Sequence, residues 1–256
     1  LHPEQPGGNG EMMVPHMYWS EKEDCQNLNI WTPSIRDGRK RPVMVWLHGG
    51  GFSAGSSIEQ LAYDGENLSR AGDVVVVSVN HRLNVLGYLD LSPFGEKYQD
   101  SANAGNLDLI AALEWIRDNI EGFGGDPENV TLFGQSGGGV KVWSLLQMPE
   151  ADGLFHKGII ESGVVDPDLL GDIEDGNGRE IVKAMLVELG LEEKDVDQLE
   201  TLPYDQLAQA YEKAAPKVAQ KGEYVGNHPH KNQSYFGDAI KHGFREETKK
   251  IPLLIG

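Results

Sequence analysis

Apolar residues occur along this chain in short runs that are separated by longer stretches with helical spacing. The most regular run is 73–79, which is almost entirely β-branched and apolar, as in a strand covered on both faces of a sheet. Runs of the same kind predict strands at 26–32, 42–48, 73–80, 129–135, 157–162 and 251–255.

Two regions show the spacing of amphipathic helices. In 104–121 the apolar positions share one face, and Gly122 follows as a stop signal. Residues 178–216 are expected to be helical too, with an acidic outer face, and to end at Pro216. Strands that alternate with helices predict an α/β fold, with a mostly parallel central sheet and helices on both of its faces.

Charge and composition exclude two classes of function. The 256 residues carry a formal net charge of −18, whereas nucleic-acid phosphates require basic patches. Acidic side chains are concentrated in 161–213. No apolar run approaches the ~20 residues that a helix needs to cross a bilayer, so no membrane span is expected.

Candidate chemistry begins with Ser136. It is the centre of a G-x-S-x-G pentapeptide at 134–138, directly after the apolar run 129–133 and before a stretch that predicts a buried helix. A serine on a tight strand-to-helix turn is lifted toward a substrate, and small neighbours let the backbone double back. This context predicts a catalytic nucleophile.

A second glycine cluster follows the predicted strand 42–48 and reads H-G-G-G-F at 48–52. Acyl transfer places a negative charge on the carbonyl oxygen, and backbone N–H groups can stabilise that charge. Glycines allow such close approach because they have no side chain. We therefore predict that the N–H groups of Gly50, Gly51 and Gly137 form an oxyanion hole.

Six segments in order give the chain its resemblance to the type-B carboxylesterase and lipase family, which includes the cholinesterases. They are EDC (23–25) with LNI (28–30), WLHGGGF (46–52), VNHRL (79–83) with LG (86–87), ANAG (102–105), FGGDP (123–127) and VTLFGQS (130–136).

The resemblance implies a single catalytic domain of the α/β-hydrolase fold over 1–256, truncated at both ends, with a helical cap or insert at 164–245. It also implies a hydrolase that acts through a serine acyl-enzyme. Because no cationic anchor is evident, we expect small uncharged esters as substrates. We expect neither a cofactor nor a metal.

Three positions differ from the usual family pattern. Gly137 stands where many members have alanine, which preserves the backbone donor. Lys141 stands where a small polar residue is usual, and we expect its side chain to reach solvent or an acidic partner. His81 stands where tyrosine is more usual, and we interpret it as a packing residue beside the site.

The triad acid and histidine of this family follow the strand that 251–255 resembles, so we expect both beyond residue 256. The chain is therefore expected to be an internal fragment, or to be accompanied by a second polypeptide with the C-terminal half of the same protein. No triad role is assigned to His156, His228, His230 or His242. The two histidines of His228-Pro229-His230 are expected in a solvated loop rather than at a metal.

Some alternatives remain open at this stage. The family also contains catalytically inactive members that act as binding or adhesion modules, although these commonly lack the nucleophile. Amide hydrolysis uses the same machinery and is not separated by motif. Cys25 is the only cysteine, which fits a reducing cytoplasm, although secreted animal relatives pair the equivalent residue.

Overall fold

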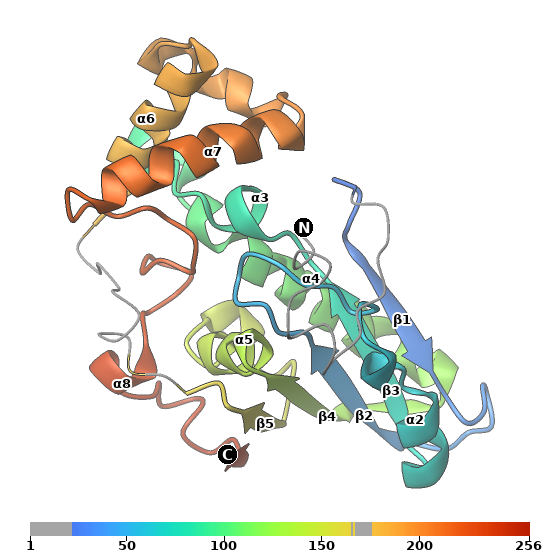
Figure 1. Ribbon diagram of the computed structural model, residues 1–256. Coiled ribbons are helices and arrows are strands. Elements are labelled where there is room, and N and C mark those ends of the chain that lie inside the picture. The colour runs from blue at the N-terminus through green and yellow to red at the C-terminus, as the bar shows by residue number, and fades with distance from the viewer. Residues whose placement is uncertain (1–21, 165, 167–175) are drawn as a thin grey trace.

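The structure is a computed structural model, and it describes residues 22–164, 166 and 176–256. Within these residues, one six-stranded sheet has the order β1-β3-β2-β4-β5-β6 (Figure 1). The first strand is antiparallel to its neighbour β3, and all the other neighbours are parallel. The strands are β1 (Asn27–Trp31), β2 (Arg41–Leu47), β3 (Val75–Asn80), β4 (Gly125–Gln135), β5 (Lys157–Glu161) and β6 (Leu253–Ile255).

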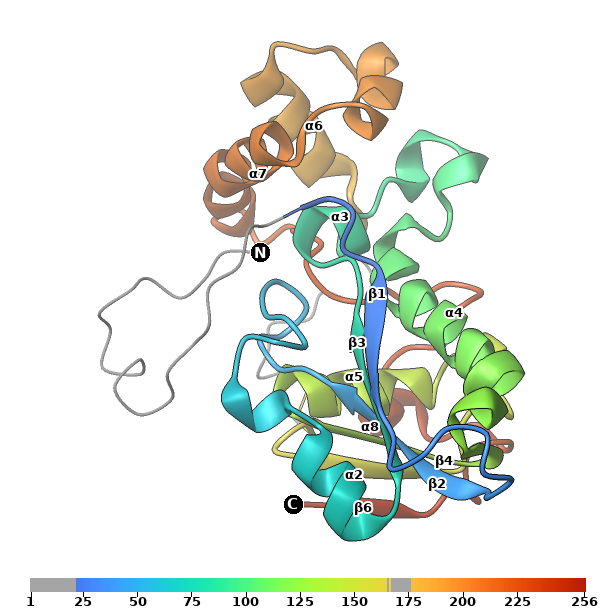
Figure 2. The same cartoon turned by 90° about the vertical axis from the view of Figure 1, so that its right-hand side faces the viewer.

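Helices cover both faces of this sheet, as the alternation of elements predicted. Helix α2 (Glu66–Gly72) and helix α4 (Ala104–Asn119) lie on opposite faces (Figure 2). Helix α5 (Gly137–Leu145) shares the face of α4, and Asn106 Nδ2 of α4 donates a hydrogen bond of 2.9 Å to Ser144 Oγ of α5. A short helix, α3 (Asn84–Tyr88), follows β3, and another, α8 (Ala239–His242), lies near the end of the chain.

The main apolar core lies between the central strands and these helices. All β3 residues except the last are buried, which confirms that this strand is covered on both faces. The next two strands of the sheet, β2 and β4, also contribute buried apolar side chains, and α4 closes the core with Leu109, Leu113 and Ile116.

A second apolar cluster lies away from the sheet. Helix α6 (Arg179–Leu189) packs on helix α7 (Tyr204–Ala219) (Figure 1), and their buried residues form one apolar cluster with Val85, Leu89 and Tyr98 of the segment that follows β3. These two helices belong to the region predicted as a cap. Residues 165 and 167–175 of that region lie outside the described residues.

The elements are those that the sequence predicted, with different ends. The turns after α4 continue to Phe123 and stop at Gly124, which has a φ of 79°, rather than at Gly122. The prediction that the helical region ends at Pro216 is wrong, because α7 continues to Ala219. Proline removes only its own N–H, and Gln220 N still donates to Pro216 O over 3.1 Å while Val218 is buried in the second cluster.

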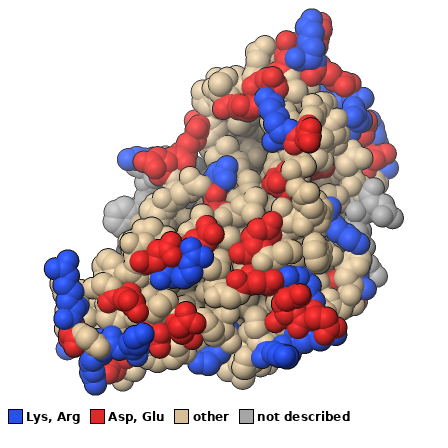
Figure 3. Space-filling view, turned by 180° about the vertical axis from the view of Figure 1, so that it is seen from behind, with Lys and Arg blue, Asp and Glu red and all other residues tan. Residues whose placement is uncertain are grey.

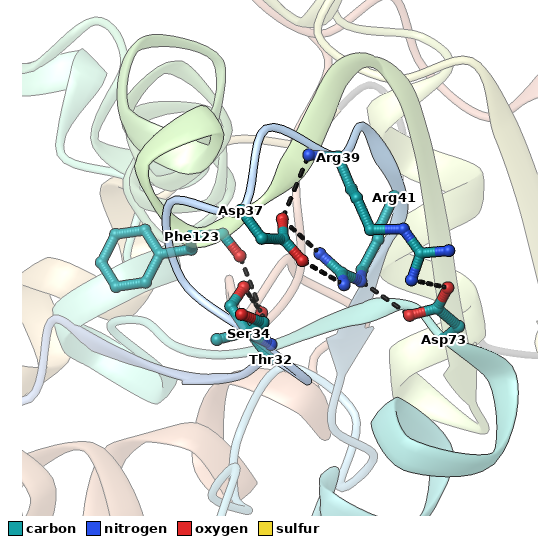
Figure 4. Close-up of polar contacts among 7 residues, drawn as sticks. All are labelled: Thr32, Ser34, Asp37, Arg39, Arg41, Asp73 and Phe123. Carbon is teal, nitrogen blue, oxygen red and sulfur yellow. Dashed lines mark hydrogen bonds and ion pairs between the residues drawn. The ribbon is translucent and has the colours of Figure 1, made fainter.

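Arg41 ties together the amino end of the sheet's central strand β2 (Figure 4). Its side chain is only 4% exposed, and its guanidinium forms a two-pronged ion pair with Asp37, at 3.0 and 2.6 Å. Its Nε donates to Asp73 Oδ1 over 2.7 Å, and Arg39 pairs with the other oxygen of Asp73 at 3.0 Å. This buried cation is therefore fully paired with carboxylates.

The surface carries both signs of charge. On the face in Figure 3, Lys and Arg side chains lie beside Asp and Glu side chains. Lys97, for example, pairs with Asp197 at 3.0 Å and with Glu200 at 2.8 Å. None of the helices in the described ranges has the length and apolar character needed to span a bilayer.

Candidate active site

Ser136 occupies a sharp turn between β4 and α5. Its φ of 54° and ψ of −124° are outside the regions that residues with side chains ordinarily adopt, so the turn is strained. Its N–H donates to Glu161 O over 2.8 Å, and its carbonyl accepts from Val140 N over 3.0 Å. These two bonds fix the turn between β5 and the first turn of the helix.

Two glycines make the turn possible. A Cβ atom on Gly138 would lie 2.0 Å from Leu47 O, and one on Gly134 would lie 2.6 Å from the carbonyl carbon of Gly138. Any side chain at either position would therefore drive the helix away from the end of β2. The strand, turn and helix have the arrangement that the G-x-S-x-G motif predicted.

The loop after β2 meets this turn through bare backbone. Gly50 and Gly51 have φ values of 87° and 62°, which favour glycine. A Cβ atom on Gly137 would lie only 2.3 Å from Gly51 N, and one on Gly49 would lie 3.8 Å from Ser136 Cβ. Gly51 and Gly137, predicted from motifs far apart in the sequence, therefore lie side by side next to the serine.

The amides of these glycines are available to a ligand. Within the described part of the chain, the N–H groups of Gly50 and Gly51 donate to no backbone acceptor. Gly137 is the first residue of α5, where an N–H has no partner within the helix and the helix dipole is positive. Such amides are suited to hold an oxygen that becomes negative beside Ser136.

Lys141 is not where the sequence predicted it to be. Its side chain is fully buried, and its Nζ donates a hydrogen bond of 2.9 Å to His48 O, at the start of the glycine loop. The reason is helical geometry, because Lys141 follows Gly137 by four residues and so faces the same loop. This spacing was visible in the sequence, but the contact between α5 and the loop was not.

Two buried histidines complete the surroundings of Lys141. The His48 and His81 rings stack with their centroids 5.4 Å apart, which confirms that His81 is a packing residue beside the site. His48 Nδ1 lies 2.8 Å from Gly49 O and donates to that carbonyl. Its Nε2, and both ring nitrogens of His81, make no well-formed hydrogen bond in the described structure.

Burial disfavours the charged forms of His48, His81 and Lys141. It lowers the pKa of His48 and of His81 well below the ordinary value, and the nearby Lys141 lowers both further. The pKa of Lys141 falls to about 7, because burial outweighs the attraction of Glu59. Both histidines are therefore neutral at pH 7, and the lysine is close to its own midpoint.

The downstream histidines do not reach the serine. His156 Nδ1 accepts a hydrogen bond of 3.1 Å from Val130 N, which is a structural contact between β4 and β5. His228 and His230 lie in a loop, as predicted, but they pack against the Tyr224 ring at centroid distances of 5.6 and 4.7 Å and are only partly exposed. The aromatic packing and the contacts with Asn103 hold this segment against the fold.

Ser136 Oγ itself has no hydrogen-bond partner among the described residues. No group of three or more potential ligands that could hold a metal ion is found in those residues either. The described part of the chain therefore contains a strained serine beside amides without a backbone acceptor, and none of its residues places a base in contact with the hydroxyl.

A cleft of about 210 Å³ opens nearby, between 22–25, 81–86 and the start of α7. Its walls include Cys25, His81, Leu83 and Tyr204, but none of Ser136, Gly50, Gly51 and Gly137. This cleft therefore reaches His81 but not the candidate nucleophile.

The chain is similar to known esterases over its whole length. A family model described as the carboxylesterase family matches residues 3–256. The para-nitrobenzyl esterase of Bacillus subtilis is 42% identical over 246 residues, which is 92% of this chain and 47% of that protein. The phenmedipham hydrolase of Pseudarthrobacter oxydans is 38% identical over 81% of this chain and 39% of its own length.

Solved structures agree with these relatives. An esterase from the anaerobe Clostridium hathewayi, described as able to hydrolyse aliphatic aromatic polyesters, superimposes with a TM-score of 0.93 at 56% identity. The match covers 100% of this chain and 50% of that one. A carboxylesterase of Geobacillus stearothermophilus gives 0.75 at 35% identity, over 94% of this chain and 49% of its own. The chain thus spans about half the length of the curated relatives that it matches.

Proposed function

Because this chain belongs to the carboxylesterase family, with the α/β-hydrolase fold, we propose that the protein containing it hydrolyses carboxylic esters through a covalent intermediate on Ser136. The observation that carries this proposal is the contact of the strained serine turn with the glycine loop, where Gly51 and Gly137 approach each other through bare backbone.

In the proposed reaction, Ser136 Oγ attacks the ester carbonyl while a base takes its proton. The carbonyl oxygen becomes negative and accepts hydrogen bonds from the N–H groups of Gly50, Gly51 and Gly137. Collapse of this intermediate breaks the bond to the alcohol, which leaves with the proton, and the acyl group remains on Ser136. Water then attacks the acyl-enzyme in the same way and releases the acid.

The base comes from outside the described residues in this proposal. His48 and His81 are buried and neutral below the glycine loop, and His156 is held by the β4 backbone. For the histidine and the acid that orients it, the family resemblance implies positions after residue 256.

For the substrate, we propose small uncharged esters with apolar acyl or aryl groups. The net charge of −18 disfavours anionic substrates, and relatives are named for a para-nitrobenzyl ester and for polyesters. We also propose that the helices α6 and α7 are part of a cap over the site, within the region 164–245. Their apolar cluster, separate from the sheet, supports this assignment.

The catalytically inactive alternative has no observation in its favour. Ser136 is retained, its turn is strained, and the relatives described above are named as esterases or as a hydrolase. Amide hydrolysis uses the same groups and is a second substrate class to be measured alongside esters.

The test uses the full-length protein that contains this chain. A fluorophosphonate probe is expected to label Ser136, because only an activated serine reacts at neutral pH. Ser136→Ala should lose both labelling and hydrolysis of p-nitrophenyl acetate, with kcat lower by on the order of 10⁴–10⁶.

Ser144→Ala is the matched control, because Ser144 is a buried serine on the same helix, and its hydroxyl forms hydrogen bonds with Asn106 and with the Lys141 carbonyl. It should retain labelling and turnover. Labelling at another residue with Ser136 unmodified would reject the proposal.

A further inference from the structure

Lys141 is a buried amine that forms no ion pair with the described residues. Its Nζ has one described hydrogen bond, to His48 O, and Glu59 attracts it only from beyond ion-pair distance. Burying an amine with so little compensation is costly, and an apolar residue of the same size would avoid that cost. The stability of the fold therefore does not account for the lysine.

The position of that hydrogen bond has a consequence for the loop. The carbonyl that Lys141 holds belongs to the peptide group that joins His48 to Gly49. The next carbonyl, that of Gly49, accepts from the His48 ring at 2.8 Å. Two successive peptide planes are thus fixed immediately before Gly50 and Gly51.

The loop needs an external restraint before Gly50 because its own glycines restrict the backbone very little. Gly50 and Gly51 have no side chains to limit their backbone angles, and a Cβ atom on Gly51 would find open space within 4 Å. Hydrogen bonds from Ser53 N and Ala54 N to Gly50 O, of 3.3 and 3.1 Å, close the far side of the turn. On the near side, the restraints are the Lys141 amine and the His48 ring.

We propose that Lys141 is a positioning residue of the oxyanion hole, which holds the His48 carbonyl so that the Gly50 and Gly51 amides keep their direction toward the oxygen on the acyl carbon. This inference rests on the proposed function. The amine does not touch the substrate, and it acts through the peptide group that it bonds. Substitution should therefore reduce stabilisation of the transition state more than binding of the ester.

The test compares Lys141→Met, which keeps the volume and removes the donor, with Lys141→Gln, which keeps an N–H donor without charge. In the full-length protein we expect Lys141→Met to lower kcat for p-nitrophenyl acetate by about 10- to 100-fold, with little change in KM. An aryl trifluoromethyl ketone, whose adduct with serine carries an oxyanion, should bind more weakly by a similar factor. Lys141→Gln should recover part of both losses.

Ser144→Ala is again the control, because it removes a buried polar contact one turn away on the side of α4. If Lys141→Met keeps kcat and ketone affinity, or if Ser144→Ala loses them equally, the inference is wrong. If Lys141→Met does not fold, the comparison is made with Lys141→Gln. A lysine with no positioning role predicts that activity falls only in proportion to the amount of folded protein, and the inference predicts a larger fall. A wild-type protein without ester turnover would instead reject the proposed function.

Discussion

The two ends of strand β2 each bury a cation, and they do so in different ways. At the amino end, Arg41 is paired with Asp37 and Asp73 through charge-assisted hydrogen bonds of 2.6 to 3.0 Å (Figure 4). Just beyond the carboxyl end, Lys141 of α5 is next to one neutral carbonyl and two neutral histidines, and the carboxylate of Glu59 attracts it only from beyond ion-pair distance. The first cation is paired directly with carboxylates, and the second is not.

The difference shows that the two ends of the parallel strands have different roles, one in stability and the other in the proposed chemistry. Turns at the amino ends of the strands connect elements, and their polar groups are free to satisfy one another. Beyond the carboxyl ends of β2 and β4, the N–H groups of Gly50, Gly51 and Gly137 donate to no backbone acceptor within the described residues. N–H groups that stabilise a negative charge during a reaction must not already be hydrogen-bonded in the resting protein.

The largest predicted contrast is between two glycines that have similar φ values, one in the loop before β2 and one in the loop after it. Gly51 and Gly38 have φ values of 62° and 75°, and a Cβ atom on either would meet nothing within 4 Å. Gly51→Val should distort the donor loop and lower kcat on the order of 10²–10³ in the full-length protein. Gly38→Val should impose the same backbone strain with no change in kcat. Steady-state kinetics and thermal unfolding of both variants check this, and equal kcat losses would contradict it.

A second contrast concerns the paired cation. Arg41→Met leaves the Asp37 carboxylate without its two-pronged partner, so the midpoint of thermal unfolding should fall by several degrees. The kcat of the folded protein should not change, because Arg41 is at the opposite end of the strand from Ser136. Arg41→Lys should recover only part of the stability, because an ammonium cannot form the two-pronged pair. If Arg41→Met had normal stability and a reduced kcat, the assignment of a structural role to the amino end of β2 would be wrong.

A third contrast is the pH dependence of stability that the buried Lys141 amine causes. The pKa of Lys141 is lowered from 10.5 to about 7 on folding. Between these values the unfolded chain holds a proton that the folded chain does not, so the free energy of unfolding rises with pH. Relative to Lys141→Met, the wild type should gain up to about 1.4 kcal/mol per pH unit from pH 7 upward. Below pH 7 both states hold the proton, and the difference should be constant.

Urea unfolding of the wild type and of Lys141→Met between pH 7 and 9.5 measures this slope. The neighbours of the amine that titrate are His48, His81 and Glu59, and the pKa values of the two histidines lie well below this range. A flat difference would show that the lysine has its ordinary pKa in the folded protein.

Most of the fold could be predicted from the sequence, because its signals are local. The β-branched run of β3 and the apolar face of α4 depend on spacing within one element. The ends of elements were less predictable. Pro216 is a strong stop signal, yet α7 continues past it because Val218 packs against the second apolar cluster. Packing of this kind involves residues that are distant in the sequence.

In the candidate site, too, some features follow from local sequence and others only from packing. Ser136, Gly50, Gly51 and Gly137 were predicted because strained turns and close backbone approach require particular residues at fixed spacing, and the sequence by itself determines those. The burial of Lys141 and its bond to His48 O were decided only by the tertiary structure. A lysine is polar in any sequence, and whether it reaches water depends on which face of α5 is placed against the loop after β2.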